Sequence, residues 1–281
     1  MSNFFEKIAS QNGLNLIEVN PLSGGDINEV FLLKCEQGSF VVKLNDALKF
    51  PEMFVAEAKG LQLLEKTATF KIPLVIGEGE IKNTSYLLVE YISSGPLNSK
   101  FSEVFAENLA KLHKTTQQHF GLEHDNYIGS LPQKNKSCDK ASEFYITQRL
   151  EPQFKMASEN GFQFNKLDQF YRNISEEIPK EAPSLIHGDL WGGNYMVSEK
   201  SQPVLIDPAV SFASREMDLA MMKLFGGFSE EIFVRYQSAF PLSPGWEKRI
   251  PFWQLYYLLV HLNLFGSGYL QRVKSVIANF S

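Results

Sequence analysis

Cysteine is scarce in this 281-residue sequence, and it contains no long run of basic residues. The two cysteines, Cys35 and Cys138, lie far apart, and neither belongs to a CxxC motif or a Cys/His cluster. We therefore expect two free thiols in a reducing compartment rather than a disulfide framework or a zinc site. The net charge of −5 disfavours an extended surface for nucleic acid or an anionic membrane, although it allows a local basic pocket for phosphate.

The sequence also lacks an export signal and an uninterrupted apolar span. Residues 1–16 carry several polar side chains and have no apolar core of signal-peptide length. They predict instead a short amphipathic helix that uses Phe4, Phe5 and Ile8. The most apolar stretch, residues 251–265, contains polar residues and is shorter than the ~20 residues of a membrane span, so it predicts a buried helix. We expect a cytoplasmic protein that does not associate with membranes.

The composition that remains is that of a globular protein, with 44% apolar and 21% charged residues. Its 23 phenylalanines predict a core rich in aromatic packing. In the first third of the chain, residues 30–34 and 39–44 are β-rich runs separated by a hairpin signal. Residues 52–66 change to helical spacing, and residues 72–76 and 86–89 predict further strands.

Helical patterns dominate the remainder of the chain. Ser, Gly and Pro in residues 90–96 indicate a linker. An amphipathic helix is predicted at residues 101–113, two helical patterns follow within 139–178, and helices resume from residue 217. Two β-rich runs interrupt them, at residues 185–186 and 204–206. We therefore predict an α+β fold with a small β-rich lobe at residues 1–89, a hinge at 90–96 and a larger, mainly helical lobe at 97–281.

The strongest functional pattern begins at residues 187–194, HGDLWGGN. Asp189 and Asn194 belong to this motif, and Asp207 directly follows an apolar run that is typical of a strand. Phosphoryl transfer needs a carboxylate at the attacking hydroxyl and oxygen ligands for Mg²⁺. The pattern predicts that Asp189 orients or deprotonates the acceptor and that Asn194 and Asp207 hold metal. An ordinary Asp/Asn turn is the alternative, which the second aspartate disfavours.

A second pattern lies upstream, where Lys43 closes a β-rich run and Glu57 follows on the predicted helix. A strand lysine oriented by a helix glutamate contacts the α and β phosphates of ATP in kinases. Either residue alone would be an ordinary surface charge, but their order and spacing favour the functional role. Gly24 and Gly25 precede these strands and would let backbone N–H groups approach phosphate, although the same residues describe an ordinary turn.

The motif at residues 187–194, together with IDPA at 206–209, resembles the fructosamine/ketosamine-3-kinase family of the protein-kinase-like fold. The HGDxxxxN core is shared with aminoglycoside phosphotransferases and choline kinases, whereas the Leu-Trp-x-Gly-Asn form at residues 190–194 and FGGF at 225–228 are narrower and select ketosamine kinases. Further similar stretches lie along nearly the whole chain: SGG at 23–25, FVVK at 40–43, LVEY at 88–91, LAKLH at 109–113, NYIG at 126–129, and the segments 216–228 and 256–266.

The resemblance implies ATP-dependent phosphorylation of the 3-hydroxyl of the sugar in ketosamines, small or protein-bound, with ATP and Mg²⁺ bound. Such phosphates decompose and free the amine, so the activity would repair glycation. The β-rich lobe would bind the nucleotide, with backbone groups of Glu90, Tyr91 and Ile92 at the adenine edge, and the helical lobe would bind the acceptor. Trp191 would lie near the acceptor sugar, unless it is a buried structural residue, and Asp218 would anchor the loop.

Departures from protein kinases disfavour a peptide acceptor. The chain has no His-Arg-Asp motif, carries Asp-Pro-Ala in place of Asp-Phe-Gly, and lacks an Ala-Pro-Glu segment. Two alternatives stay open, namely a kinase for another small hydroxyl compound such as an aminoglycoside or choline, and a non-catalytic nucleotide-binding protein. The presence of all four of Lys43, Asp189, Asn194 and Asp207 places the second alternative low. We expect a monomer or a weak homodimer.

Overall fold

The computed structural model describes residues 2–22 and 27–281. The chain forms two compact units. The first unit contains Met1–Asn98 and Met196–Asp207, and the second contains Ser99–Tyr195 and Pro208–Ser281. The residues that the sequence suggests as a linker, 90–96, are grouped with the first unit. The chain therefore crosses between the units three times, and the segment that ends at Asp207 belongs with the N-terminal strands.

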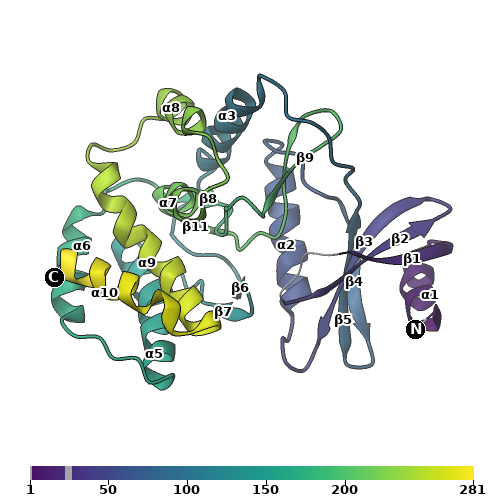
Figure 1. Cartoon of the computed structure of the whole chain (residues 1–281), viewed down its shortest axis with the longest axis horizontal. Helices are drawn as coiled ribbons and strands as arrows, with labels where there is room; N and C mark the ends of the chain where they lie inside the picture. Colours follow the sequence, from purple (N-terminus) through teal and green to yellow (C-terminus); the bar gives the residue numbers. More distant parts are fainter. Residues whose placement is uncertain (1, 23–26) are drawn as a thin grey trace. The chain divides into compact units, whose positions relative to one another are not determined.

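A five-stranded antiparallel sheet forms the centre of the first unit (Figure 1), with the strand order β1-β2-β3-β5-β4. The predicted hairpin is confirmed, because β2 and β3 pair from Glu29 opposite Leu44 to Cys35 opposite Gly38. The strand bounds are β1 Leu16–Leu22, β2 Glu29–Cys35, β3 Gly38–Asp46, β4 Val75–Ile81 and β5 Thr84–Glu90.

Two strands differ from expectation. The strand predicted at residues 72–76 begins at Val75 and continues to Ile81, through a Gly-Glu-Gly-Glu stretch whose composition is poor in β-forming residues. The edge strand β1 was not expected, since Pro21 within it weakens the pattern. Proline is tolerated at an edge because its missing N–H is not needed by a second neighbour.

One helix accompanies each face of this sheet. The helix α1, Ser2–Gln11, is confirmed as amphipathic, and its buried Phe5 and Ile8 belong to a cluster with Val42 of β3. Successive side chains of a strand point to opposite faces, so Lys43 points away from α1. The helix α2, Met53–Lys66, lies on that opposite face, where Lys43 contacts it. The alternation along β3 therefore directs a lysine toward α2.

Helices make up most of the second unit. The helix α3, Phe101–His113, is confirmed with the predicted bounds. The predicted helical patterns within residues 139–178 correspond to three α-helices and a π-helical turn at Tyr145–Leu150. The helix bounds are α4 Ala141–Phe144, α5 Glu151–Glu159, α6 Leu167–Glu177, α7 Glu216–Phe225, α8 Glu230–Ala239, α9 Trp246–Phe265 and α10 Leu270–Asn279.

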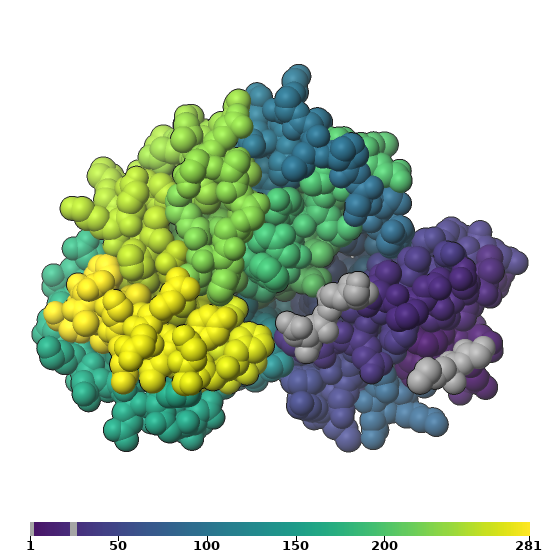
Figure 2. Space-filling model, viewed as in Figure 1, coloured from purple at the N-terminus to yellow at the C-terminus, as the bar shows by residue number. Residues whose placement is uncertain are grey.

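The helix α9 is the centre of the second core, as the apolar stretch predicted. Its Trp253, Tyr256 and Tyr257 are fully buried, and α5, α7 and α10 pack against it (Figure 1). One side of α10 is buried, and the C-terminal residues form part of the outer surface of this unit (yellow in Figure 2). Among the helices that the structure describes, none is long and apolar enough to cross a membrane.

Short antiparallel pairs complete the structure, and two of them border the predicted loop. The strand β8 pairs with β11, and β9 pairs with β10. A further pair, β6 and β7, lies between α3 and α4 in the sequence. Cys35 and Cys138 are free and buried, as expected. The strand bounds are β6 Asn126–Ile128, β7 Leu131–Gln133, β8 Ser184–Ile186, β9 Tyr195–Val197, β10 Pro203–Leu205 and β11 Ser211–Ala213.

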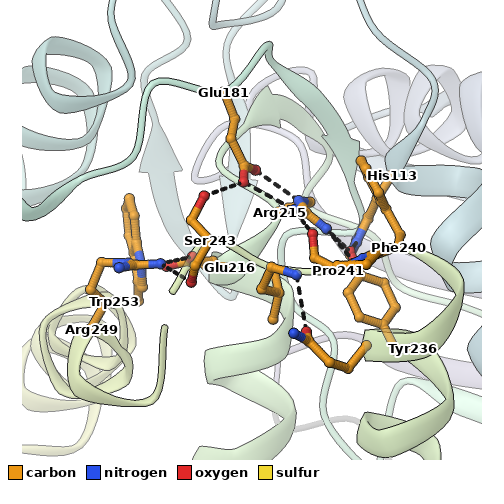
Figure 3. A network of polar contacts seen from close by, with 12 residues as sticks. His113, Glu181, Arg215, Glu216, Tyr236, Phe240, Pro241, Ser243, Arg249 and Trp253 are labelled. Carbon is orange, nitrogen blue, oxygen red and sulfur yellow. Dashed lines mark hydrogen bonds and ion pairs between the residues drawn. The ribbon is translucent and has the colours of Figure 1, made fainter. Parts of the chain in front are cut away.

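Two ion pairs fix the start of α7 (Figure 3). Arg249 donates to both carboxylate oxygens of Glu216, at 2.6 and 2.9 Å, and the indole N–H of Trp253 donates to Glu216 at 2.8 Å. Arg215 donates to both oxygens of Glu181, at 2.7 and 3.0 Å. Both arginines are buried, so each needs these partners to offset its desolvation. The network ties α7 to α9 and to the segment that precedes β8.

The ion pair of Glu181 with Arg215 makes the free energy of unfolding depend on pH. Burial alone raises the pKa of Glu181, but the hydrogen bonds and charge of Arg215 outweigh it, so the pKa lies below its ordinary value. A lowered pKa in the folded state stabilises the fold above the unfolded-state pKa, and this contribution is lost as the pH falls through the folded-state pKa.

We expect Glu181→Gln to lower the free energy of unfolding by about 1.5–3 kcal/mol at pH 7, because Arg215 loses a charged acceptor. The deficit relative to wild type should shrink at acidic pH, as the pH falls through the lowered pKa of Glu181 and its carboxylate becomes protonated. Urea unfolding at both pH values measures it, and Glu159→Gln, at an exposed position on α5, is the control. A deficit that is the same at both pH values would contradict this role for the ionised carboxylate.

Candidate functional site

In the first unit, three of the predicted site residues lie together. The Nζ atom of Lys43 on β3 donates to Glu57 Oε1 of α2 at 2.6 Å, and it also donates to Asp207 Oδ1. Asp207 follows β10, so the ion pair joins the returning segment to the N-terminal sheet and helix. Lys43 is buried and Glu57 is mostly buried, with 13% of its side chain exposed, whereas the side chain of Asp207 is 47% exposed.

The charges of these three residues are interdependent. Burial alone would lower the pKa of Lys43, but the carboxylates of Asp207 and Glu57 outweigh burial and raise it. Burial raises the pKa of Glu57, the positive charge of Lys43 opposes this rise, and Asp207 adds to it. Lys43 is therefore a fixed positive charge at neutral pH. When both carboxylates are ionised the cluster has one negative charge in excess, which favours a further cation beside it.

The backbone at Asp207 is unusual. Its φ of 55° lies in the left-handed region, which aspartate tolerates better than most residues but which still costs energy. The turn begins directly after β10 and directs the carboxylate to Lys43. Since Lys43 bonds Oδ1, the second oxygen of this half-exposed carboxylate remains for another ligand.

Most of the predicted nucleotide-contacting residues would use their backbone N–H groups, and some of these groups already have hydrogen-bond partners. Gly24 and Gly25 lie outside the described residues. The amide of Glu90 donates to Leu74 O at 2.8 Å, and the amide of Tyr91 donates to Ser39 O at 3.3 Å, so the sheet uses both donors. The carboxylate of Glu90 accepts a hydrogen bond from Lys71 at 2.6 Å.

The backbone amide of Ile92 differs from those of Glu90 and Tyr91 in its hydrogen bonding. Among backbone groups of the described residues, none accepts a hydrogen bond from the Ile92 amide. Of the three residues predicted at the adenine edge, Ile92 therefore keeps the backbone donor that an adenine nitrogen would require.

In the second unit, Asp189 and Asn194 lie together in the predicted loop. The side-chain amide of Asn194 donates to Asp189 Oδ2 at 2.9 Å and to the Asp189 carbonyl at 2.8 Å. The backbone N–H of Asn194 donates to Trp191 O at 3.0 Å, which closes the turn. These bonds fix the orientation of the Asp189 carboxylate and use the N–H groups of Asn194, leaving its amide oxygen for a ligand.

The start of the loop is anchored by Asp218 of α7, as expected. Its fully buried carboxylate accepts the backbone N–H of His187 at 2.8 Å and of Gly188 at 2.9 Å. Gly188 has a φ of 84°, and a Cβ there would lie 2.0 Å from Ala209 O, so only glycine fits. His113 also contacts Asp218, at 3.2 Å. The carboxylate therefore fixes the two residues that precede Asp189.

Two residues of this support were missed in the sequence as members of the site. His113 ends α3, and its Nδ1 is 2.8 Å from the hydroxyl of Tyr236 on α8, which Figure 3 shows beside it. The only available signal was a histidine on an apolar helix face, which predicts a hydrogen-bonded core residue rather than a particular partner. That general prediction is confirmed, since both ring nitrogens of His113 have partners.

Trp191 is not a buried structural residue. It is 41% exposed, and a Cβ on Gly193 would lie 2.4 Å from its indole. The ring therefore rests on the bare backbone of Gly193 and exposes part of its remaining surface. This arrangement excludes the buried alternative and provides an apolar surface next to the Asp189 loop.

Each unit contains a residue with a hard oxygen atom of the kind that suits Mg²⁺. In the first unit this is the second carboxylate oxygen of Asp207, and in the second unit it is the side-chain oxygen of Asn194. Within the described part of the chain, no group of three or more His, Cys, Asp and Glu residues could hold an ion alone. Mg²⁺ commonly uses one or two protein oxygens and completes its shell with phosphate and water. The oxygen of each residue, taken by itself, is therefore of the kind that binds an ion arriving with a nucleotide.

Comparisons with known proteins agree over the whole chain. A sequence model of the fructosamine kinase family matches residues 2–281. An Enterococcus faecium protein named a probable ketoamine kinase is 38% identical over 269 residues, which cover 94% of this chain and 95% of that protein. A crystal structure of a Haemophilus somnus protein named as a fructosamine-3-kinase has a TM-score of 0.90 at 27% identity, covering 98% of this chain and 96% of the other.

A more distant structure shares the fold alone. It is a thermostable mutant of aminoglycoside phosphotransferase APH(4)-Ia in ternary complex with AMP-PNP and hygromycin B. The TM-score is 0.65 at 15% identity, with 98% of this chain and 97% of that chain covered. The β-rich first unit and the helical second unit are thus those of a protein-kinase-like fold, as the sequence predicted.

The anchoring by Asp218 can be tested without reference to any reaction. In Asp218→Asn the side chain keeps one acceptor oxygen and presents an NH₂ group to a backbone N–H, so one donor loses its partner. We expect the amides of His187 and Gly188 to exchange hydrogen at least roughly tenfold faster, and the free energy of unfolding to fall by about 1–3 kcal/mol. Hydrogen exchange measured by mass spectrometry tests this, with Asp168→Asn at an exposed position as the control. Equal exchange rates of the His187 and Gly188 amides in the two variants would contradict the anchoring role of Asp218.

Proposed function

We propose, because this chain belongs to the fructosamine kinase family, that it transfers the γ-phosphate of ATP to the 3-hydroxyl of the sugar in ketosamines. The observation that carries the proposal is the bonding of Lys43 to both Glu57 and Asp207. A kinase needs its strand lysine paired with a helix glutamate, and it needs the aspartate that follows the metal-site strand. Family membership narrows the acceptor to a ketosamine.

The nucleotide would be held by the first unit. Lys43, fixed as a cation by Glu57, would contact the α and β phosphates. The Ile92 amide would donate to the adenine edge, while Glu90 and Tyr91 would support it through the sheet. Gly24 and Gly25 would contribute backbone N–H groups to the phosphates, as their sequence predicts.

Asn194 and Asp207 would hold Mg²⁺, which when bound neutralises charge on the nucleotide phosphates. Their available oxygens support this assignment. The protein's own part is then mostly positioning, since phosphoryl transfer requires little covalent chemistry from side chains.

The acceptor would meet the second unit. Asp189 would accept the proton of the sugar hydroxyl or orient that hydroxyl. The hydrogen bond from Asn194 to its Oδ2, beside a second one to its backbone carbonyl, supports a fixed carboxylate for this task. Trp191 would provide an apolar surface for the carbon skeleton of the sugar, because aromatic rings pack well against the C–H groups of sugars. The amine carrier, either a free amino acid or a protein lysine, would extend from the sugar and be recognised loosely.

The biological consequence would be repair. A ketosamine phosphorylated at its 3-hydroxyl decomposes and releases the amine, so the proposed reaction removes a sugar from a glycated molecule. The substrate would therefore be a fructosamine- or ribulosamine-type adduct, on a small molecule or on a protein.

Asp189→Asn should lower kcat by roughly 10²–10⁴-fold, because the amide cannot accept the proton, while nucleotide affinity stays within about twofold. ADP formation coupled to NADH oxidation measures turnover, and calorimetric titration with a non-hydrolysable ATP analogue measures affinity. Asp168→Asn controls for the loss of one charge. Turnover near the wild-type level in Asp189→Asn would remove this residue from the mechanism.

The purified protein should phosphorylate fructosamine and ribulosamine adducts of several amines at similar rates. Trp191→Ala should raise KM for the ketosamine roughly three- to tenfold and leave KM for ATP unchanged, whereas Trp191→Phe, which keeps an aromatic surface, should lie between the two. The same coupled assay with aminoglycosides and choline is the comparison. Transfer to either of those compounds, with none to any ketosamine, would refute the proposed acceptor.

A further inference from the structure

Two glycines from distant segments are in direct backbone contact in the second unit. Gly192 lies in the Asp189 loop, and Gly227 follows the C-terminus of α7. A Cβ on Gly227 would lie 2.7 Å from Gly192 Cα, closer than real Cβ atoms approach backbone. A Cβ on Gly192 would lie 3.2 Å from Gly226 O and from Gly227 Cα. The absence of a side chain is therefore required at Gly227, and at Gly192 a Cβ would fit only if its neighbours moved by a few tenths of an ångström.

A hydrogen bond and aromatic rings hold this contact together. The hydroxyl of Tyr195, the residue after Asn194, donates to Gly227 O at 2.9 Å. The Tyr195 ring lies 5.1 Å from that of Phe228 and 5.6 Å from that of Phe105 on α3. The segment after α7 is thus bonded to the end of the same loop whose start is bonded to Asp218 of α7.

The contact lies next to Trp191 rather than next to Asp189. Asp189 is oriented by Asn194 through two hydrogen bonds of its own. The indole of Trp191 rests on Gly193, and the backbone of Gly192 connects the two residues. A displacement of Gly192 therefore moves the indole first, whereas the Asp189 carboxylate keeps its hydrogen bond from Asn194.

We propose that the contact between Gly192 and Gly227, closed by the Tyr195 hydroxyl, positions the Trp191 indole and thereby sets how tightly the sugar of the acceptor is bound. This rests on the proposed function for the identity of the acceptor and for the contact between its sugar and Trp191. Gly192, Gly227 and Tyr195 are positioning residues, since they act through the indole. Two residues of FGGF at 225–228 maintain this contact, because Gly227 must lack a side chain and the Phe228 ring packs against Tyr195.

A simpler account would be that these glycines only permit backbone turns. Gly227 has a φ of 91°, so Gly227→Ala combines backbone strain with a steric contact. Gly192 has no such φ, so Gly192→Ala introduces the contact alone. Gly266, which follows α9, has a φ of 86° and no atom within 4 Å of a Cβ, so Gly266→Ala introduces strain alone. The comparison of Gly192→Ala with Gly266→Ala separates the two accounts.

The test has two readouts. In the first, ¹⁹F-labelled tryptophan gives one NMR signal for each of the three tryptophans, and Trp191→Phe assigns that of Trp191. We expect Gly192→Ala and Tyr195→Phe to shift the Trp191 signal and Gly266→Ala to leave it in place. This readout needs no substrate, so it tests the positioning even if the protein proves inactive on ketosamines.

In the second readout, kinetics separate binding of the acceptor from binding of ATP. Gly192→Ala should raise KM for a fructosamine roughly five- to tenfold with KM for ATP unchanged, since a few tenths of an ångström displace the indole. Tyr195→Phe should act in the same direction and more weakly. An equal rise in both KM values, or a Trp191 signal in Gly192→Ala that matches the wild type, would overturn the proposal. Inactivity of the wild-type protein on every ketosamine would instead refute the proposed function.

Discussion

The acceptance of two consecutive backbone amides by Asp218 is the constraint on which the second unit depends. A buried carboxylate is costly unless it is paired, and here His187, Gly188 and His113 compensate it. Because Asp218 lies in the first turn of α7, the position of that helix is transmitted to the Asp189 loop through bonds of about 3 Å. The ion pair of Glu216 with Arg249 holds α7 against α9, and Asp218 of α7 holds the loop. The Asp189 loop is therefore linked to the core of the second unit through α7.

The first unit fixes its site residues by charge rather than by backbone bonds. Alternation along β3 directs Lys43 toward α2, and Glu57 and Asp207 then determine where its ammonium lies. Burial makes the charges of Lys43 and Glu57 depend on each other, because Glu57 without Lys43 would be left poorly solvated, whereas Asp207 is half-exposed. A point charge held between two carboxylates tolerates small backbone shifts, whereas the short amide bonds of Asp218 do not.

The sequence predicted what depends on local pattern. The β2–β3 hairpin, α2 and α3 follow from strong periodicity, and the HGDLWGGN loop follows from residue types at fixed spacing. The pattern could not reveal β1, because an edge strand with Pro21 looks irregular, nor the return of residues 196–207 to the first unit, because that depends on tertiary packing. The contact between Gly192 and Gly227 was hidden for the same reason, since each glycine alone describes only a turn.

Several site residues depart from ordinary folding preferences, which argues for function independently of family likeness. Lys43 is buried, Trp191 is exposed, and Asp207 has a positive φ. Positive φ alone is weak evidence, because Lys82 shares it in the turn between β4 and β5. At Asp207, however, the strained backbone also directs a carboxylate to a buried cation, which a turn does not require. In sequences that fold well, local conformational preferences and burial preferences mostly agree with the fold, and positions that violate them are expected at functional sites. Lys43 and Asp207 are among the positions that the phosphoryl-transfer patterns in the sequence selected, whereas Trp191 was selected by the family resemblance.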